Sequence, residues 1–417
     1  MRILKITVAG IMLIMLAHAS AASIKNDSLG EVIVLVEGAT RTKDSTVESL
    51  VKTCLEKENY KSWESINPVM MGQCISNSRL FESVRVRVRK PQIDVTVVDR
   101  WTLIPVPVAY AINGQRLIGV FIIDSNFLGY GKTVGVGGAV STEGNALTLF
   151  YRDPAVNFSD FTVGASVNQS SIELDQYQRN NIINAYMKRE QLLRFSPGYK
   201  ITPTLELAAL LNYSDKRYEE IAPFTSVPGN YWSYGAGARL TYVNADYKLY
   251  YNDGVSTNIQ WLRQIHRSDT SENVSQASLR FEWDTLLFYQ QALQLAVQAA
   301  NLTDNGNAGD ILTYGRVKGY RGINPDGLWT RRVVTASVDY QIPVKRIYPG
   351  IFTVAPFLDY GMYQPVSPAT GSNYAAYGVG GYLFINAISL PGAIGILIGH
   401  NEAFMGNFIS FQLGYAY

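Results

Sequence analysis

Apolar and polar residues alternate along most of the chain after residue 105. In SLRFEWD, the side chains of Leu279, Phe281 and Trp283 fall on one face of an extended strand, and the polar side chains between them fall on the other. The segments 291–300 and 333–342 follow the same rule. Because successive side chains of a strand point to opposite faces, this period of two predicts β-strands with one apolar and one polar face.

About sixteen such strands follow one another, most of them joined by short turns. They are predicted near 106–113, 116–125, 131–142, 145–152, 160–174, 186–201, 204–215, 232–245, 253–265, 275–285, 288–301, 331–343, 350–361, 373–388, 392–401 and 405–417. The longest connection, roughly 302–330, contains the stretch VKGYRG. An even number of strands is what bacterial single-chain membrane barrels require.

The aromatic content decides between a membrane barrel and a soluble sandwich. Aromatic residues make up 12% of the chain and tyrosine alone occurs 27 times, with many aromatics on the apolar strand faces. Transmembrane barrels have apolar outer faces with aromatic girdles and polar inner faces, whereas a sandwich buries one face against a second sheet. We therefore predict a mainly β protein, with a transmembrane antiparallel β-barrel over 105–417.

The N-terminus has the features of a secretory signal peptide over residues 1–21. Arg2 and Lys5 precede an apolar run from Ile6 to Leu16, and Ala19-Ser20-Ala21 is a cleavage site of the A-x-A type. Removing it lowers Lys+Arg from 36 to 34, which balances the 34 Asp+Glu residues. A neutral mature chain argues against nucleic acid as a partner.

Residues that bind metals or carry acid–base catalysis are scarce. His18 lies in the predicted signal peptide, which leaves His266 and His400. We expect no metal, no cofactor and no catalytic residues, and therefore a protein that is not an enzyme.

Residues 30–100 have a different pattern, which predicts a small α+β domain. A strand over GEVIVLVEG is followed by helical stretches near 45–57 and 68–77 and then by two strands, SVRVRVRK and QIDVTVVD. The order is βααββ. Cys54 lies in the first helix and Cys74 in the second. A disulfide between them would add roughly 3 kcal/mol in the chain-entropy model, and two unpaired buried thiols are the alternative.

Several short motifs, in this order, resemble the superfamily of outer-membrane assembly and translocation proteins that combine POTRA domains with a barrel, of the BamA/TamA or bacterial surface antigen type. The motifs are EVIVLVEGATRTKDSTVESLV, SRLFESVRVRV, DSNFLGYGK (124–132), VKGYRG (317–322), ASVDY (336–340) and FLDYG (357–361). The resemblance implies one POTRA-like periplasmic domain over 30–100, a barrel in the bacterial outer membrane and a non-enzymatic role in polypeptide insertion or transport.

The resemblance also implies that the VKGYRG loop folds back into the barrel lumen, where a cation meets acidic residues of the wall. The family motif has arginine where this chain has Lys318, and the next arginine is Arg321. Lysine cannot form the two-pronged contact that arginine makes with a carboxylate, so either Lys318 substitutes weakly or Arg321 takes the role. The loop residues concerned are Lys318, Gly319, Tyr320, Arg321 and Gly322.

Two aspartates are expected to receive these cations. Asp339 shares a strand face with Ser337 and Gln341, which is the polar face and should point into the lumen. Asp359 is predicted on the adjacent antiparallel strand. An ordinary extracellular loop with solvated charges is the alternative.

A strand edge of the N-terminal domain is a candidate site for capturing a client strand by β-augmentation. The residues of this edge are Val84, Arg85, Val86, Arg87, Val88 and Arg89. The same cations, with Lys90, would also protect an edge against pairing with itself, which is the alternative interpretation.

The junction between the first and last barrel strands is predicted to be a weak seam that opens sideways. PVPVAY contains two prolines, and proline cannot donate a ladder hydrogen bond. The residues assigned to the seam are Pro107, Val108, Phe411, Leu413, Tyr415 and Tyr417.

These features predict an outer-membrane protein whose partners are membrane lipid, unfolded outer-membrane or secreted polypeptides and periplasmic proteins. A secretion pore of the two-partner type that exports one dedicated protein is the alternative function. A structural or diffusion barrel is the third.

Overall fold

The computed structural model describes most of the chain after residue 23. The described ranges are 24–26, 29–112, 115–178, 181–221, 227–269, 273–303, 312–315, 318–323, 328–347, 350–365, 372–385, 393–404 and 406–414. The predicted signal peptide, residues 1–21, and the seam residues Tyr415 and Tyr417 lie outside these ranges.

The N-terminal part forms a four-stranded sheet with two helices. Its elements are β1 (Ile24–Asn26), β2 (Gly30–Glu37), α2 (Asp44–Glu58), the 3-10 turn η1 (Trp63–Ser65), α3 (Pro68–Ser76), β3 (Phe81–Arg89) and β4 (Gln92–Asp99). The strand order is β1-β2-β4-β3, with β2 and β4 parallel and β3 and β4 antiparallel. The short strand β1 has no counterpart in the predicted βααββ order.

Apolar side chains at alternate positions of the strands form the face of this sheet that the helices cover. Ile93 and Val95 of β4 are fully buried in one core with Val51 of α2 and Met71 of α3. The Cys54–Cys74 disulfide joins the two helices, with a Cα separation of 5.9 Å. Helix α3 begins where the side chain of Asn67 accepts hydrogen bonds from two backbone amides of its first turn.

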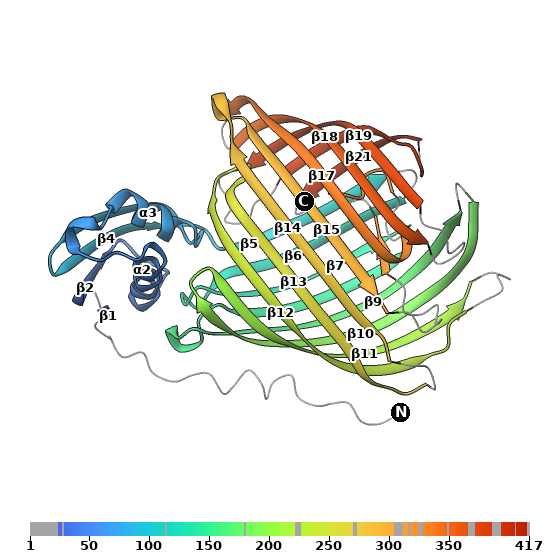
Figure 1. Cartoon of the computed structure of the whole chain (residues 1–417), viewed down its shortest axis with the longest axis horizontal. Coiled ribbons are helices and arrows are strands. Elements are labelled where there is room, and N and C mark those ends of the chain that lie inside the picture. Colours follow the sequence, from blue (N-terminus) through green and yellow to red (C-terminus); the bar gives the residue numbers. More distant parts are fainter. Residues whose placement is uncertain are drawn as a thin grey trace.

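The rest of the chain closes into an antiparallel barrel of sixteen long strands. They are β5 (Leu103–Ile112), β6 (Gln115–Phe127), β7 (Lys132–Ser141), β8 (Gly144–Asp153), β9 (Phe161–Gln178), β10 (Asn181–Thr202), β11 (Leu205–Glu220), β12 (Tyr231–Tyr247), β13 (Asn252–Arg267), β14 (Ser275–Leu286), β15 (Ala292–Leu302), β17 (Leu328–Ile347), β18 (Gly350–Pro365), β19 (Ser372–Ile385), β20 (Ala393–Asn401) and β21 (Gly406–Gly414). This confirms the predicted fold class. Figure 1 shows the N-terminal domain as a separate lobe at one end of the barrel.

Two local features differ from the predicted strands. The long connection contains a three-residue strand, β16 (Leu312–Tyr314), which pairs with the start of β17. The strand predicted from residue 288 begins at Ala292 instead. Phe288–Gln290 form a 3-10 turn (η3), in which Tyr289 and Gln290 have positive φ angles that a strand does not allow. A second such turn, η2 (Val156–Phe158), joins β8 to β9.

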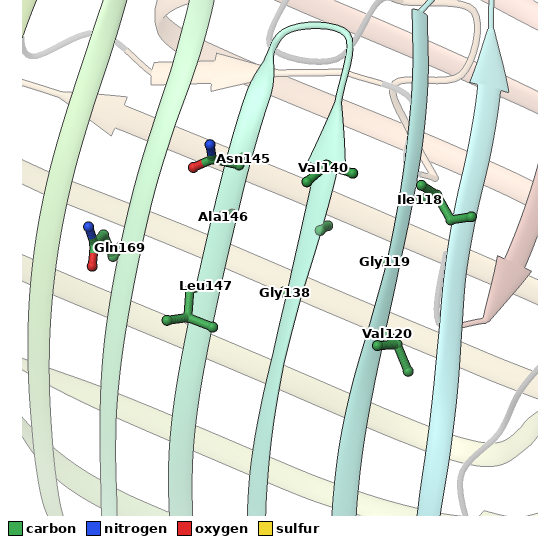
Figure 2. Close-up of a pocket in the computed structure, with 10 residues that line it drawn as sticks. Ile118, Gly119, Val120, Gly138, Val140, Asn145, Ala146, Leu147 and Gln169 are labelled. Atoms are coloured by element: carbon green, nitrogen blue, oxygen red, sulfur yellow. The ribbon is translucent and has the colours of Figure 1, made fainter.

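The outer surface of the barrel is apolar. Large apolar side chains on alternate positions are exposed, among them Ile118, Leu207, Trp261 and Val334. Their exposure in the absence of lipid is what a membrane-facing surface shows. A shallow hollow of about 720 Å³ lies on this surface over β6–β9, bordered by the side chains of Ile118, Val120, Val140 and Leu147 and floored at Gly138 (Figure 2). Among the described residues, no helix has the length and apolarity to cross a bilayer.

Candidate functional site

The loop Lys318–Ile323 lies against the inner wall of the barrel. Tyr320 and Ile323 are almost fully buried, and the ring of Tyr320 stacks on Tyr314 of β16 with centroids 4.7 Å apart. Gly322 has φ +73°, and a Cβ atom there would come within 2.6 Å of the Phe408 ring on β21. The glycine therefore allows both the left-handed turn and the close approach to the last strand.

Arg321 connects two acidic residues of the wall. Its guanidinium donates to Asp359 through Nε (2.9 Å, to Oδ2) and Nη2 (2.7 Å, to Oδ1), and to Asp339 Oδ1 through Nη1 (2.6 Å). Nη2 also donates to Ser337 Oγ, which in turn donates to Asp359 Oδ1, each at 2.6 Å. Asp359 is fully buried. The guanidinium carbon of Arg321 lies 4.0 Å from the centre of the Phe357 ring.

The strand register explains why these groups meet. On β17 and β18, Ser337 is paired with Asp359, and Asp339 is paired with Phe357. The two aspartates are therefore diagonal neighbours on the inner face, close enough for one guanidinium to reach both. Two such carboxylates in a buried wall would repel each other and lose hydration without a cation.

Lys318 also reaches the wall, on Asp339. Its ammonium lies 2.8 Å from Asp339 Oδ2, whereas Asp359 receives Arg321. Both cations therefore bind the wall. Arg321 contacts both carboxylate oxygens of Asp359, as the planar guanidinium allows, and Lys318 makes a single contact with Asp339.

Side chains from four strands of the wall form hydrogen bonds with the backbone of the loop. The amides of Gly319 and Arg321 both donate to Asp359 Oδ2, at 3.1 and 3.2 Å. The remaining contacts run from Gln298 on β15 to the Lys318 carbonyl, from Tyr374 on β19 to the Gly319 carbonyl and from Asn401 on β20 to the Arg321 carbonyl. Sequence reasoning did not identify Gln298, Tyr374 or Asn401, because their place in the wall depends on the path of the loop.

The β21–β5 junction has the shortest described pairing among the long barrel strands. Three residue pairs join β21 to β5, whereas nine join β21 to β20 and ten join β5 to β6, counted over the described residues. Phe411 and Leu413 pair with Ala111 and Ala109. Pro107 and Val108 pair with Val120 and Gly119 on β6, on the other side of their strand.

In the N-terminal domain, the predicted capture edge is β3, which is the last strand of its sheet. Along β3, the side chains of Val84, Val86 and Val88 are half-buried against the core, and those of Arg85, Arg87 and Arg89 are exposed. Among the described strands, only β4 pairs with β3.

The motif DSNFLGYGK forms the turn between β6 and β7, and this turn is docked on the N-terminal domain. Asn126 is buried and donates through Nδ2 to Thr42 Oγ1 (2.8 Å), while its Oδ1 accepts from the Gly131 amide (2.8 Å). The carbonyl of Gly129 accepts from the Lys43 amide (2.9 Å) and from Thr46 Oγ1 (2.8 Å).

Gly129 has a positive φ of +83°, and a Cβ atom there would lie 2.4 Å from the Arg41 carbonyl oxygen. The glycine therefore permits both the turn and the contact between domains.

Asp99 fixes the segment of the N-terminal domain that meets this turn. Its carboxylate accepts hydrogen bonds from the backbone amides of Thr40, Arg41 and Thr42 and from both threonine hydroxyls. Burial of Asp99 opposes ionisation, but these bonds, led by that from the Thr42 hydroxyl, outweigh it and hold the pKa of Asp99 below its usual value.

A second contact joins the domain to the end of β12. Asn77, which follows α3, donates to Asp246 Oδ1 (2.8 Å) and accepts from the Tyr247 amide (3.1 Å). The guanidinium of Arg79 lies 3.9 Å from the centre of the Tyr247 ring. The domain is therefore anchored at two separate points of the barrel rim, one of them next to the seam strand β5.

Replacing Asn126 with alanine should loosen the first contact. The change removes the hydrogen bond that Thr42 Oγ1 accepts and leaves the Gly131 amide without its acceptor, at about 1–3 kcal/mol for a buried unsatisfied group. We expect faster hydrogen exchange at the amide of Lys43, measured by mass spectrometry on the full-length protein. Asn145→Ala is the control, because Asn145 is exposed on the outer surface. Equal exchange in the two variants would contradict the docking role.

Acid should weaken the same contact. Because the pKa of Asp99 is depressed in the folded protein, its stabilising contribution is complete above the unfolded value, about 3.9, and is lost as pH falls through the folded pKa. Exchange at the Arg41 and Thr42 amides, corrected for intrinsic rates, should therefore rise below about pH 4. In Asp99→Asn it should be fast at neutral pH and lack this acid transition. A transition that persists in the variant would assign it to another group.

No group of three or more His, Cys, Asp or Glu side chains that could hold a metal ion occurs among the described residues.

Comparison with known proteins identifies the barrel. The model of the Omp85 superfamily domain matches residues 126–387, which is more than half of the chain. No curated protein has a significant sequence match to this chain.

Three solved structures have the same fold at low sequence identity. BamA from Haemophilus ducreyi lacking POTRA domains 1–3 is 14% identical with a TM-score of 0.56, and the alignment covers 92% of this chain and 85% of that one. CdiB from Escherichia coli is 12% identical with a TM-score of 0.57, covering 92% and 76%. CdiB from Acinetobacter baumannii is 11% identical with a TM-score of 0.56, covering 93% and 74%.

Proposed function

The chain belongs to the Omp85 superfamily, and we propose that this outer-membrane protein assembles or translocates unfolded polypeptides without enzymatic chemistry. The N-terminal domain acts as a POTRA-like periplasmic module that captures a client strand on β3. The barrel receives the client at the β21–β5 seam, where a strand can replace the short native pairing.

The observation that carries this proposal is the seam together with the loop beside it. Among the described residues, three pairs join β21 to β5 and nine join β21 to β20, so a client strand has fewer described pairings to replace at this junction. The loop contacts β21 through Gly322 and Phe408, so the strand on one side of the seam is held from inside the lumen. The docked N-terminal domain is connected to β5 on the other side by three residues, Arg100–Thr102.

The proposal is tested by depleting the protein from its own cells and measuring the outer-membrane and secreted proteomes. Loss of several outer-membrane barrels, restored by the wild-type chain, is the expected result. Loss of one secreted protein alone would assign the chain to export of the two-partner type. Unchanged proteomes would leave a structural or diffusion barrel.

A further inference from the structure

The free edge of β3 carries a row of three arginines on one face. Arg85, Arg87 and Arg89 are all exposed, and their spacing of two places them on the face of the sheet away from the helices. Their side chains follow one another along the last strand of the sheet. A strand added to this edge would have every second side chain beside this row.

The three arginines outnumber the one carboxylate, that of Asp94, which lies opposite them on the neighbouring strand. Arg87 is paired across the ladder with Asp94, whose carboxylate accepts a hydrogen bond from Gln92. None of the three arginines forms an ion pair with a described acidic residue. The exposed face beside the edge is therefore cationic, and Lys90 follows directly after it.

The opposite face of the same edge is apolar and backed by a helix. Gly72 of α3 lies against β3, where an added Cβ atom would still be 3.9 Å from the Val86 side chain and the Val84 carbonyl. Val69 precedes Gly72 by three residues on the same helix face and is 80% exposed. A strand paired with β3 would find apolar contacts on this side.

We propose that the β3 edge selects client strands that carry acidic residues at alternate positions and apolar residues between them. The proposal rests on the strand-capture function proposed above and names its substrate class. Carboxylates placed opposite Arg85, Arg87 and Arg89 accept charge-assisted hydrogen bonds, while the alternate apolar residues pack towards Val69. Strands of outer-membrane barrels alternate in this way, so an unfolded client barrel contains suitable segments wherever its lumen face is acidic.

The same arginines disfavour pairing of this edge with a second copy of the chain. A second copy of this chain that approached edge to edge would bring like charges opposite one another, which destabilises pairing. Charge thus both prevents self-association through β3 and favours an acidic strand.

The test uses the full-length, disulfide-bonded protein in detergent and two labelled peptides with the same alternating valines. One peptide has glutamate and the other lysine at the remaining positions, and both carry a photoreactive group. From three cross-strand charge pairs we expect the glutamate peptide to bind about tenfold more tightly, with its crosslinks in 81–89. The preference should shrink as salt concentration rises.

One charge reversal and a matched control locate the effect. Arg87→Glu should weaken binding of the glutamate peptide by about fivefold and strengthen binding of the lysine peptide. Lys61→Glu changes net charge equally at an exposed site away from β3, and it should leave both affinities unchanged.

Each other result overturns the proposal in a distinct way. Equal binding of both peptides with crosslinks in β3 would remove charge selection and keep strand capture. Absence of crosslinks to β3 from either peptide would remove the capture step of the proposed function as well. If Arg87→Glu weakened binding only to phosphatidylglycerol vesicles, the arginines would serve a lipid surface instead.

Discussion

Replacing Arg321 with alanine should release the loop 318–323 from the lumen wall and abolish function, while the barrel stays folded in the membrane. The guanidinium makes contacts with Asp359, Asp339 and Ser337. Its removal leaves a fully buried carboxylate without its main cation, a change of about 3–5 kcal/mol when the pair is shielded from water.

Hydrogen exchange at the amides of Gly319 and Arg321 measures this release, because both amides donate to Asp359. In Arg321→Ala the Gly319 amide should exchange at least about 100-fold faster, and the residue-321 amide likewise. Heat-modifiable migration on gels should stay normal, as the barrel ladders remain intact.

Two further variants make the result specific. Lys318→Ala should have a smaller effect, since among the described residues Lys318 makes one ion pair, with Asp339. Arg280→Ala is the control, because Arg280 pairs with Glu282 at an exposed site and such pairs contribute about 0–1 kcal/mol. If Arg321→Ala left the exchange unchanged, or if it functioned normally, the loop would have no locking role.

Locking the seam should abolish function reversibly. Cysteines at Ala109 and Leu413 are directly opposite in the β5–β21 register, so oxidation would join the two strands covalently. A client strand that must enter between them would then be excluded. Reductant should restore activity, measured as recovery of the outer-membrane proteins lost on depletion.

The control is a second cysteine pair across an ordinary ladder. Ile118 and Val140 face each other on β6 and β7, and a disulfide there crosses no proposed entry site. Both pairs are placed in a background with Cys54 and Cys74 replaced by serine, so that reductant acts on the engineered bond alone. Full function of the oxidised seam variant would favour transport through the lumen or a structural role.

The barrel could be predicted from sequence because its signal is local. Every strand repeats a two-residue period, as in Leu279, Phe281 and Trp283, and the strand count follows from the turns between them. The same local reading missed β1 and β16, each three residues long, since so short a segment has no measurable period.

The lumen contact was predictable in its residue types but not in its pairing. The polar face of β17 indicated that Asp339 points inwards, and the family motif placed a cation nearby. Which cation reaches which carboxylate depends on the left-handed turns at Gly319 and Gly322, which set the direction of the side chains between them.

The docking turn shows the opposite case, in which the motif was evident and its role was not. Asn126 and Gly129 stand in DSNFLGYGK, yet their partners Thr42 and Thr46 are more than 80 residues away in the chain. A contact between the N-terminal domain and the barrel leaves no periodic pattern in the sequence of either, so it emerges only from the tertiary structure.

The most direct test of the central claim, that clients enter at the seam, is site-specific photocrosslinking in cells during outer-membrane protein synthesis. Crosslinkers are placed at Ala109 on β5, which pairs with Leu413 across the seam, at Ala296 on the lumen face of β15 and at Trp261 on the outer surface of β13. The account predicts that newly made polypeptides are captured at Ala109 and not at Trp261. Capture at Ala296 without capture at Ala109 would contradict it and place the client's path through the lumen.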